Sequence, residues 1–269
     1  DLAAYGCGKG DAAANGGSFS AGEKSFLLEL MEAIAAIPGH FWVRLLYIHP
    51  DHFNADILGL MQSDSRFLPY FDIPFQSGDD GIIRAMNRRG TAEGYRSLVQ
   101  TIRDALPESA LRTTFLTGFP GESEAAAGNT RNFLRAIQSD WSGCFPYSSE
   151  EGTPAATKKG KVPHKKALER AKALEAIQAE ITGLRLKDRV GKVYEVLVEE
   201  VVENRDGTDE GLAIGRAWFE APEVDGNVVI SYDLDDERAV REIVPGSFVK
   251  VRALSSSEFD ISAEWTGEQ

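Results

Sequence analysis

The sequence predicts an α/β protein in two parts: an incomplete parallel (β/α) barrel of the TIM type, followed by a small antiparallel β-barrel of OB-like size. Apolar, β-branched segments alternate with amphipathic segments through the first half of the chain, which is typical of parallel strands joined by helices. A Gly-rich turn separates a predicted strand from a predicted helix within Leu111–Glu122, LRTTFLTGFPGE. Residues 190–269 hold short alternating segments between turn residues, as small β-barrels do.

The first part is expected to contain four strands separated by helices. At 269 residues and 42% hydrophobic content, the chain is long enough to bury a full core. Predicted strands cover 41–48, 70–75, 111–117 and 142–147, and predicted helices cover 23–37, 56–62, 79–86, 91–106 and 123–138. Helical connections between strands are right-handed crossovers, so neighbouring strands should be parallel, in either a barrel or an open sheet.

A change of composition marks the second part. Residues 157–166 are Lys-rich, and a long charged helix with an apolar stripe is predicted over 165–187. Five short strands are then expected at 194–202, 211–218, 227–232, 248–254 and 258–265. The predicted domains are therefore 1–160 for the partial barrel, 161–189 for a linking helix and 190–269 for the small barrel.

The negative charge belongs mainly to the second part. The whole chain has a net charge of −13, and from Arg189 onward 8 Lys and Arg stand against 19 Asp and Glu, a net charge of −11. Such a surface repels phosphate backbones and attracts basic partners. It therefore favours a basic protein over RNA, although a solvated acidic surface without a partner is the simpler alternative.

Targeting signals and cysteine patterns say little. No apolar segment approaches the roughly 20 residues of a membrane span, and no signal-peptide pattern is present, so we expect a cytoplasmic protein. The two cysteines, Cys7 and Cys144, form neither a disulfide framework nor a metal-cluster motif. The chain starts at Asp1 and opens like the end of an element already begun, so we expect an upstream part to be missing.

Candidate site residues follow the predicted strands. They are His49 and Pro50, Gln76 and Ser77, Gly118 to Glu122, and Tyr147 to Thr153. Each has a structural alternative, such as a strand-end imidazole for His49, a loop cap for Gln76 and a solvent-facing strand residue for Arg112. Together, at the carboxyl edge of a parallel sheet, polar groups, a guanidinium and small glycines suit a zwitterionic nucleoside ligand.

Five segments carry a resemblance to a known family. They are WVRLLYIHPDH (42–52), YFDIPFQSGDDGIIRAMNRRG (70–90), LRTTFLTGFPGES (111–123), FPYSSEEGTPA (145–155) and IGRAWFEAPEVDG (214–226). The chain resembles the radical S-adenosylmethionine methylthiotransferases, and its second part resembles their TRAM domain. The first three segments are shared with tRNA-modifying members, whereas Glu150–Thr153 and Ala221–Gly226 resemble the members that modify a ribosomal protein.

The resemblance implies roles for individual residues. The residues expected to hold S-adenosylmethionine are Gln76, Ser77, Arg112, Gly118, Phe119, Pro120 and Gly121. Those expected to face or bind substrate are Tyr147, Glu150, Glu151, Trp218, Glu220, Glu223 and Asp225, with a barrel-core role as the alternative for Trp218. The implied substrate is an aspartate β-carbon in the basic small-subunit ribosomal protein number twelve, and RNA binding by the TRAM part is not expected.

The chain departs from the family in its cysteines. The family uses a Cys-x-x-x-Cys-x-x-Cys triad for one [4Fe-4S] cluster and three further cysteines for a second, and neither set occurs in this sequence. Cys7 lies in a predicted loop, and Cys144 lies inside a predicted strand. We therefore expect no catalytic or metal-ligating residues here, and no activity from this chain alone.

Two other functions remain open. A tRNA methylthiotransferase would share the partial barrel but would need a basic TRAM surface to bind RNA tightly. A non-catalytic module that docks a basic protein through its acidic barrel would not bind S-adenosylmethionine even with the missing segment restored.

Overall fold

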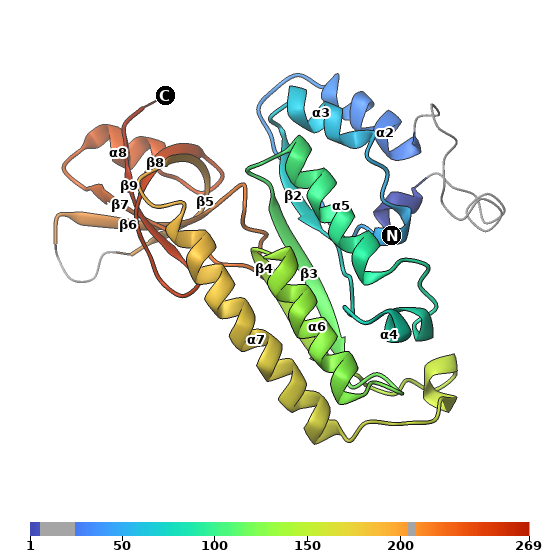
Figure 1. Cartoon of the computed structure of the whole chain (residues 1–269). Coiled ribbons are helices and arrows are strands. Elements are labelled where there is room, and N and C mark those ends of the chain that lie inside the picture. The colour runs from blue at the N-terminus through green and yellow to red at the C-terminus, as the bar shows by residue number, and fades with distance from the viewer. Residues whose placement is uncertain (6–24, 204–207, 269) are drawn as a thin grey trace. The chain divides into compact units, whose positions relative to one another are not determined.

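The computed structural model describes residues 1–5, 25–203 and 208–268, so the predicted loop role of Cys7 lies outside the described residues (Figure 1). The chain forms two compact units, Asp1–Gln178 and Ala179–Gln269. The division falls inside one long helix, α7 (His164–Lys187). No helix in the described ranges is both long and apolar enough to span a bilayer.

The first unit is built on a four-stranded sheet in the order β1-β2-β3-β4. Its strands are β1 (Val43–Leu45), β2 (Phe67–Asp72), β3 (Ala110–Thr117) and β4 (Trp141–Pro146). All three neighbouring pairs are parallel, as predicted from the helical connections. Because sheet order equals chain order, each helix returns the chain to the next strand position.

The first two strands differ in extent from the prediction. β1 is only three residues long, because Tyr47 takes a positive φ of 61° and the chain turns out of the ladder. β2 starts at Phe67 and ends at Asp72, before Pro74, which has no N–H to continue the ladder. Extended chain resumes briefly at Gln76, which forms an isolated parallel bridge with Phe115.

The strands are preceded, separated and followed by helices. They are η1 (Leu2–Ala4), α2 (Phe26–Ala35), η2 (Pro50–His52), α3 (Ile57–Ser63), α4 (Asp80–Ala85), α5 (Ala92–Ala105), α6 (Glu124–Ile137), η3 (Pro154–Thr157) and α7. Side-chain caps set several starts; for example, the Ser123 hydroxyl accepts from the Ala126 N–H and starts α6 just after the Gly-rich turn.

Figure 1 shows α5 and α6 side by side in front of β2 and β3. The core between them contains three aromatic rings, with Phe133 of α6 packed edge-on against Phe75 and Phe115 at centroid distances of 5.4 and 6.3 Å. All three rings are buried. This packing holds the strand ends of the first unit in place.

The second unit is a closed barrel in the order β5-β6-β7-β9-β8. Its elements are β5 (Val193–Val202), β6 (Glu210–Ala217), β7 (Val228–Asp233), α8 (Glu237–Glu242), β8 (Phe248–Ser256) and β9 (Ile261–Trp265). The small barrel predicted for this part is confirmed, with four antiparallel pairs and one parallel pair, β7 with β9. A closed ring of five strands cannot alternate direction at every pair, so one parallel pair is unavoidable. The short helix α8, capped by Asp236, was not predicted.

Candidate functional site

The Gly-rich turn after β3 is held closely against α7. Gly118 has a φ of +75°, and a Cβ added to it would lie 2.3 Å from the Ala167 Cβ of α7. Its N–H donates to the Glu122 carboxylate at 2.6 Å. Gly118 therefore serves close helix packing and an internal hydrogen bond, rather than presenting a bare amide.

A buried ion pair fastens this turn. Arg170 of α7 donates to a Glu122 carboxylate oxygen at 2.7 Å and to the Glu122 carbonyl at 3.1 Å. The two side chains are 6% and 2% exposed. The second guanidinium nitrogen of Arg170 reaches Glu124, whose pKa is lowered by that hydrogen bond. Sequence analysis missed this pair because 48 residues separate its members and no local pattern joins them.

Gln76 and Ser77 lie at the carboxyl end of the sheet, as predicted. Gln76 has a left-handed φ of 68°; its N–H donates to the Thr114 carbonyl and its C=O accepts from the Leu116 N–H, along one edge of β3. Left-handed backbone at a residue other than glycine is strained and persists where surroundings enforce it, often at functional sites. Ser77 is 1% exposed, and its hydroxyl contacts Thr130 of α6 and accepts from the Asp79 N–H.

Arg112 lies near the amino end of β3 and not at the rim where the strands end. Its guanidinium contacts the Asp72 carboxylate at 3.3 Å, and Asp72 also accepts from the Tyr47 N–H at 3.0 Å. Arg112 is thus already paired with a carboxylate of the neighbouring strand. Any contact between Arg112 and a ligand would be made on the sheet surface, further from the carboxyl end of β3 than the rim.

Phe119 and Tyr147 form the aromatic part of the rim. Their rings meet edge to face at a centroid distance of 5.3 Å, and Phe119 is 5% exposed. The Tyr147 N–H donates to the Thr117 carbonyl, which places Tyr147 directly beside the end of β3. Its hydroxyl is buried and has no hydrogen-bond partner in the described part of the chain. A buried hydroxyl without a protein partner can hydrogen-bond to water or to a polar group of a ligand, so Tyr147 is a candidate ligand contact.

The remaining rim residues are simpler. Pro120 is buried, whereas Gly121 is exposed with a φ of +93° and donates its N–H to the Gly160 carbonyl. Glu150 and Glu151 are exposed on the loop after β4. The rim thus brings together Gln76, Ser77, Tyr147 and the turn after β3, while Arg112 stands apart.

The predicted substrate residues of the second unit lie in the turn after β6. Trp218 is half-buried under the Arg189 guanidinium, 5.0 Å from the ring centroid, and its neighbour Phe219 supplies the core aromatic. Glu220 is fully buried and accepts from the Ala217 N–H at 2.8 Å. Burial raises its pKa to about 8. Its carboxyl is therefore buried and not on the surface expected of a docking residue.

The last two of these residues shape the same turn. Asp225 accepts from the Ala221 N–H at 2.8 Å. Glu223 is exposed and has a positive φ of 67°. Of the four predicted residues in this turn, Glu223 is the most accessible to a partner protein.

Metal-ligating side chains gather at one point among the described residues. Asp1, His49 and His52 offer three ligand-type atoms within 4.8 Å of one another, and the two imidazole rings stack at 4.8 Å. Burial, followed by the charge of Arg88, lowers the pKa of His49 to about 4. Cys144 is buried, and burial raises its pKa to about 11, so it is a protonated thiol and not a thiolate ligand.

Comparison with known proteins shows which sequences the chain is similar to. Residues 190–266 match the TRAM domain family. The chain is 48% identical over 271 residues, covering 98% of its length, to the ribosomal protein uS12 methylthiotransferase RimO of Treponema denticola. By sequence, the chain is similar to RimO over almost its whole length. The RimO of Thermotoga petrophila is 37% identical over 238 residues, which is 88% of this chain.

The match to RimO covers part of each relative. The chain spans 57% of the Treponema protein and 52% of the Thermotoga protein. Among solved structures, coproporphyrinogen III oxidase (HemN) of Escherichia coli, described as a radical SAM enzyme, overlaps 66% of this chain and 44% of its own, with a TM-score of 0.44 and 14% identity. A likeness this weak does not bear on function.

Proposed function

We propose that this RimO relative works within a longer radical S-adenosylmethionine methylthiotransferase that modifies an aspartate of ribosomal protein uS12. The observation that carries the proposal is the 48% identity to a protein of that name over 98% of this chain. The first unit would supply part of the S-adenosylmethionine site, and the TRAM unit would supply the docking surface for the substrate. The chain would be inactive alone, because its two cysteines cannot hold a cluster.

The rim residues fit the cofactor in part. The orphaned hydroxyl of Tyr147 offers a hydrogen bond, and the Phe119 and Tyr147 rings offer an apolar surface for adenine. Gln76, whose left-handed backbone is strained, provides a half-buried polar side chain at the end of the sheet. When bound, S-adenosylmethionine would supply the methyl group and, with a reduced cluster, the radical chemistry.

The turn after β3 has a supporting role in this proposal. Glu122 and Arg170 fix the position of the turn, and the Gly118 N–H is already engaged. Phe119 is therefore held in place beside Tyr147. Arg112 would offer its positive charge from the sheet surface, where its ion pair with Asp72 fixes the guanidinium.

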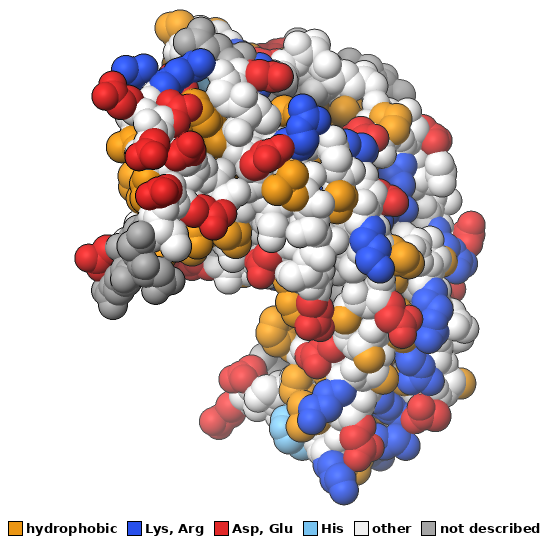
Figure 2. Space-filling view, turned by 90° about the vertical axis from the view of Figure 1, so that its left-hand side faces the viewer, with side chains coloured by type: hydrophobic (Ala, Val, Ile, Leu, Met, Phe, Trp, Pro, Cys, Tyr) orange, Lys and Arg blue, Asp and Glu red, His pale blue; other side chains and the backbone are white. Residues whose placement is uncertain are grey.

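A ribosomal protein is favoured over RNA as substrate by charge. The second unit has a net charge of −11 from Arg189 onward, and acidic side chains gather on the visible face of the barrel in the upper part of Figure 2. Neutralising nucleic acid phosphates requires an excess of Lys and Arg over Asp and Glu, and this unit has no such excess. A basic ribosomal protein has the complementary charge.

The test uses the full-length protein. It is reconstituted anaerobically with iron and sulfide and given S-adenosylmethionine, a reductant and ribosomal protein uS12, and the intact mass of uS12 is measured. A gain of one methylthio group on one aspartate supports the proposal. Modification of tRNA instead would replace it with a tRNA methylthiotransferase, and no product on either would favour a non-catalytic docking module.

A further inference from the structure

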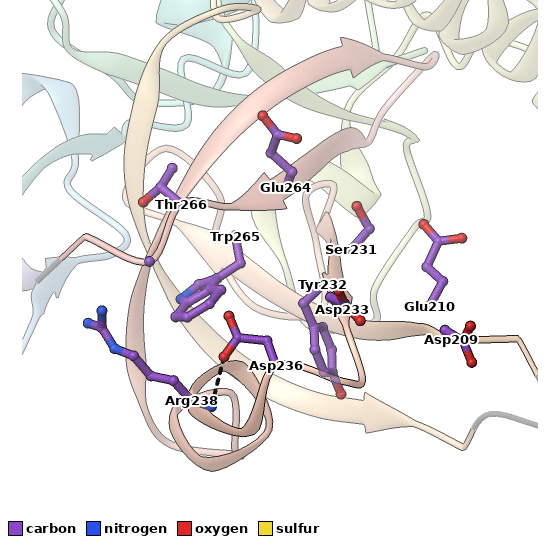
Figure 3. Close-up of a pocket in the computed structure, with 11 residues that line it drawn as sticks. Asp209, Glu210, Ser231, Tyr232, Asp233, Asp236, Arg238, Glu264, Trp265 and Thr266 are labelled. Carbon is purple, nitrogen blue, oxygen red and sulfur yellow. Dashed lines mark hydrogen bonds between the residues drawn. The ribbon is translucent and has the colours of Figure 1, made fainter.

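The second unit contains an open pocket that none of the roles above uses. It has a volume of about 860 Å³. Four segments line it: the start of β6, the end of β7, the first turn of α8 and the end of β9 (Figure 3). The pocket is an open hollow of the surface rather than an enclosed cavity, so it suits a segment laid across it better than a small enclosed ligand.

The lining is strongly acidic. Five carboxylates line the pocket, contributed by Asp209, Glu210, Asp233, Asp236 and Glu264. The single basic side chain among the lining residues, Arg238, donates to Glu242 at 2.8 Å, a residue that is not part of the lining. The pocket therefore carries a negative potential and favours a cation.

An aromatic ring in the pocket already accepts a guanidinium. The Arg238 guanidinium carbon lies 5.6 Å from the centroid of the Trp265 ring, and Figure 3 shows Trp265 and Arg238 on the same side of the pocket. Trp is the ring that attracts cations most strongly. Arg238 of the same chain already lies over this ring, so an arginine from a partner would stack on its other face or replace Arg238. A planar guanidinium can stack on a ring and pair with carboxylates at once.

The carboxylates are spread too widely for one metal ion. Within the described ranges, the group that brings three ligand-type atoms within 4.8 Å is Asp1 with His49 and His52, and the pocket's carboxylates form no such group. A metal ion needs its ligands gathered around one point, whereas an extended cationic segment meets them one after another. The sign of the charge excludes a phosphate-bearing ligand.

We infer that this pocket docks an arginine-containing segment of a basic protein, with one guanidinium against Trp265 and further cationic side chains along the carboxylates. The inference rests on the proposed function in naming a ribosomal protein as the partner class. The predicted docking residues in the turn after β6 lie elsewhere on the barrel, so this pocket is a separate contact for the same partner.

The test is a fluorescence titration of the 269-residue chain with a short peptide of alternating glycine and arginine. The matched control peptide has citrulline in place of arginine, which keeps the shape and removes the charge. We expect saturable binding of the arginine peptide that weakens with added salt, and at least about tenfold weaker binding of the citrulline peptide. The fluorescence response should be lost in Trp265→Phe, because the tryptophans that remain do not line the pocket.

Charge variants separate the pocket from the general field of the unit. Asp209→Asn with Glu264→Gln removes two exposed carboxylates of the pocket, and Glu200→Gln with Glu258→Gln removes two exposed carboxylates outside it. The pocket pair should raise the Kd about tenfold, and the control pair less than about twofold. Equal effects of the two pairs, or equal binding of the two peptides, would overturn the inference.

The titration needs neither S-adenosylmethionine nor a cluster. It can therefore fail while the full-length protein still modifies uS12, which would remove the pocket and leave the proposed function in place. Peptide binding without modification of uS12 would keep the pocket and remove the proposed function.

Discussion

At the scale of single residues, the hydroxyl groups of Tyr147 and Tyr95 allow a candidate ligand contact to be compared with a structural one. It is buried without a partner in the described chain, whereas the hydroxyl of Tyr95 donates to Asp51 at 2.8 Å. A buried polar group without a partner destabilises the fold unless a ligand satisfies it. The same substitution at these two positions should therefore have opposite consequences.

We predict that Tyr147→Phe leaves the free energy of unfolding unchanged or slightly raised, while weakening S-adenosylmethionine binding by the full-length protein about tenfold. Tyr95→Phe should lower the free energy of unfolding by about 1 to 2 kcal/mol and leave cofactor binding unchanged. Urea denaturation and calorimetric titration measure the two quantities. A loss of stability in Tyr147→Phe would show that the hydroxyl is structural.

Glu220 makes the stability of the barrel depend on pH. Its pKa is raised from 4.5 to about 8 by burial, so the folded state keeps a proton that the unfolded state has released. The stabilisation is complete below the unfolded pKa and is lost as pH rises towards the folded pKa. Asp225 and Asp260 raise this pKa further, and Arg189 lowers it.

We predict that the free energy of unfolding of the second unit falls between pH 5 and pH 8, by up to about 1.4 kcal/mol per pH unit. Glu220→Gln should remove most of this slope, because the amide carries no titrating proton. Urea denaturation at several pH values measures both proteins. An unchanged slope in the variant would assign the pH dependence to other groups.

At the scale of elements, the packing of the turn after β3 on α7 depends on Gly118. Gly121 is the matched control, because its φ is also positive, at +93°, but an added Cβ meets no atom within 4 Å. We predict that Gly118→Ala lowers the free energy of unfolding by about 3 kcal/mol or more, from strain plus the clash with Ala167. Gly121→Ala should cost about 1 kcal/mol. Similar losses at both positions would mean that α7 yields to the added methyl group.

The ion pair between Glu122 and Arg170 connects the same two elements. Arg170→Met leaves the Glu122 carboxylate buried without its partner, so we predict a loss of about 3 to 5 kcal/mol in the free energy of unfolding. Adding Glu122→Gln should restore a large part of that loss, since the amide oxygen can still accept from the Gly118 N–H. The four proteins form a double-mutant cycle measured by urea denaturation, and purely additive losses would argue against a direct pair.

At the scale of the whole molecule, charge sets the class of partner. We predict that the chain does not bind tRNA measurably at physiological salt, because few phosphates could be neutralised by a chain of net charge −13. A filter-binding assay measures this, with a basic RNA-binding protein as the positive control. Tight binding that weakens steeply with salt would return the tRNA-modifying function to consideration.

The two-part architecture, the parallel order of the first sheet and the acidic character of the second unit could all be predicted from the sequence. These features depend on local periodicity and composition, which are visible along the chain: alternation for strands, helical spacing for α5 and α6, and a charge count that needs no fold. The sequence also identified the strand ends that carry Gln76 and Tyr147, because carboxyl ends of parallel strands share one edge.

Contacts between distant residues depend on the folded chain. Glu122 pairs with Arg170, Arg112 pairs with Asp72, and Glu220 is buried, and none of these outcomes has a local signal. The pocket around Trp265 combines residues of β6, β7, α8 and β9, whose neighbours are set by closure of the barrel. Closure of five strands also forced one parallel pair, β7 with β9. Long-range register and burial arise from packing the whole chain rather than from any one segment.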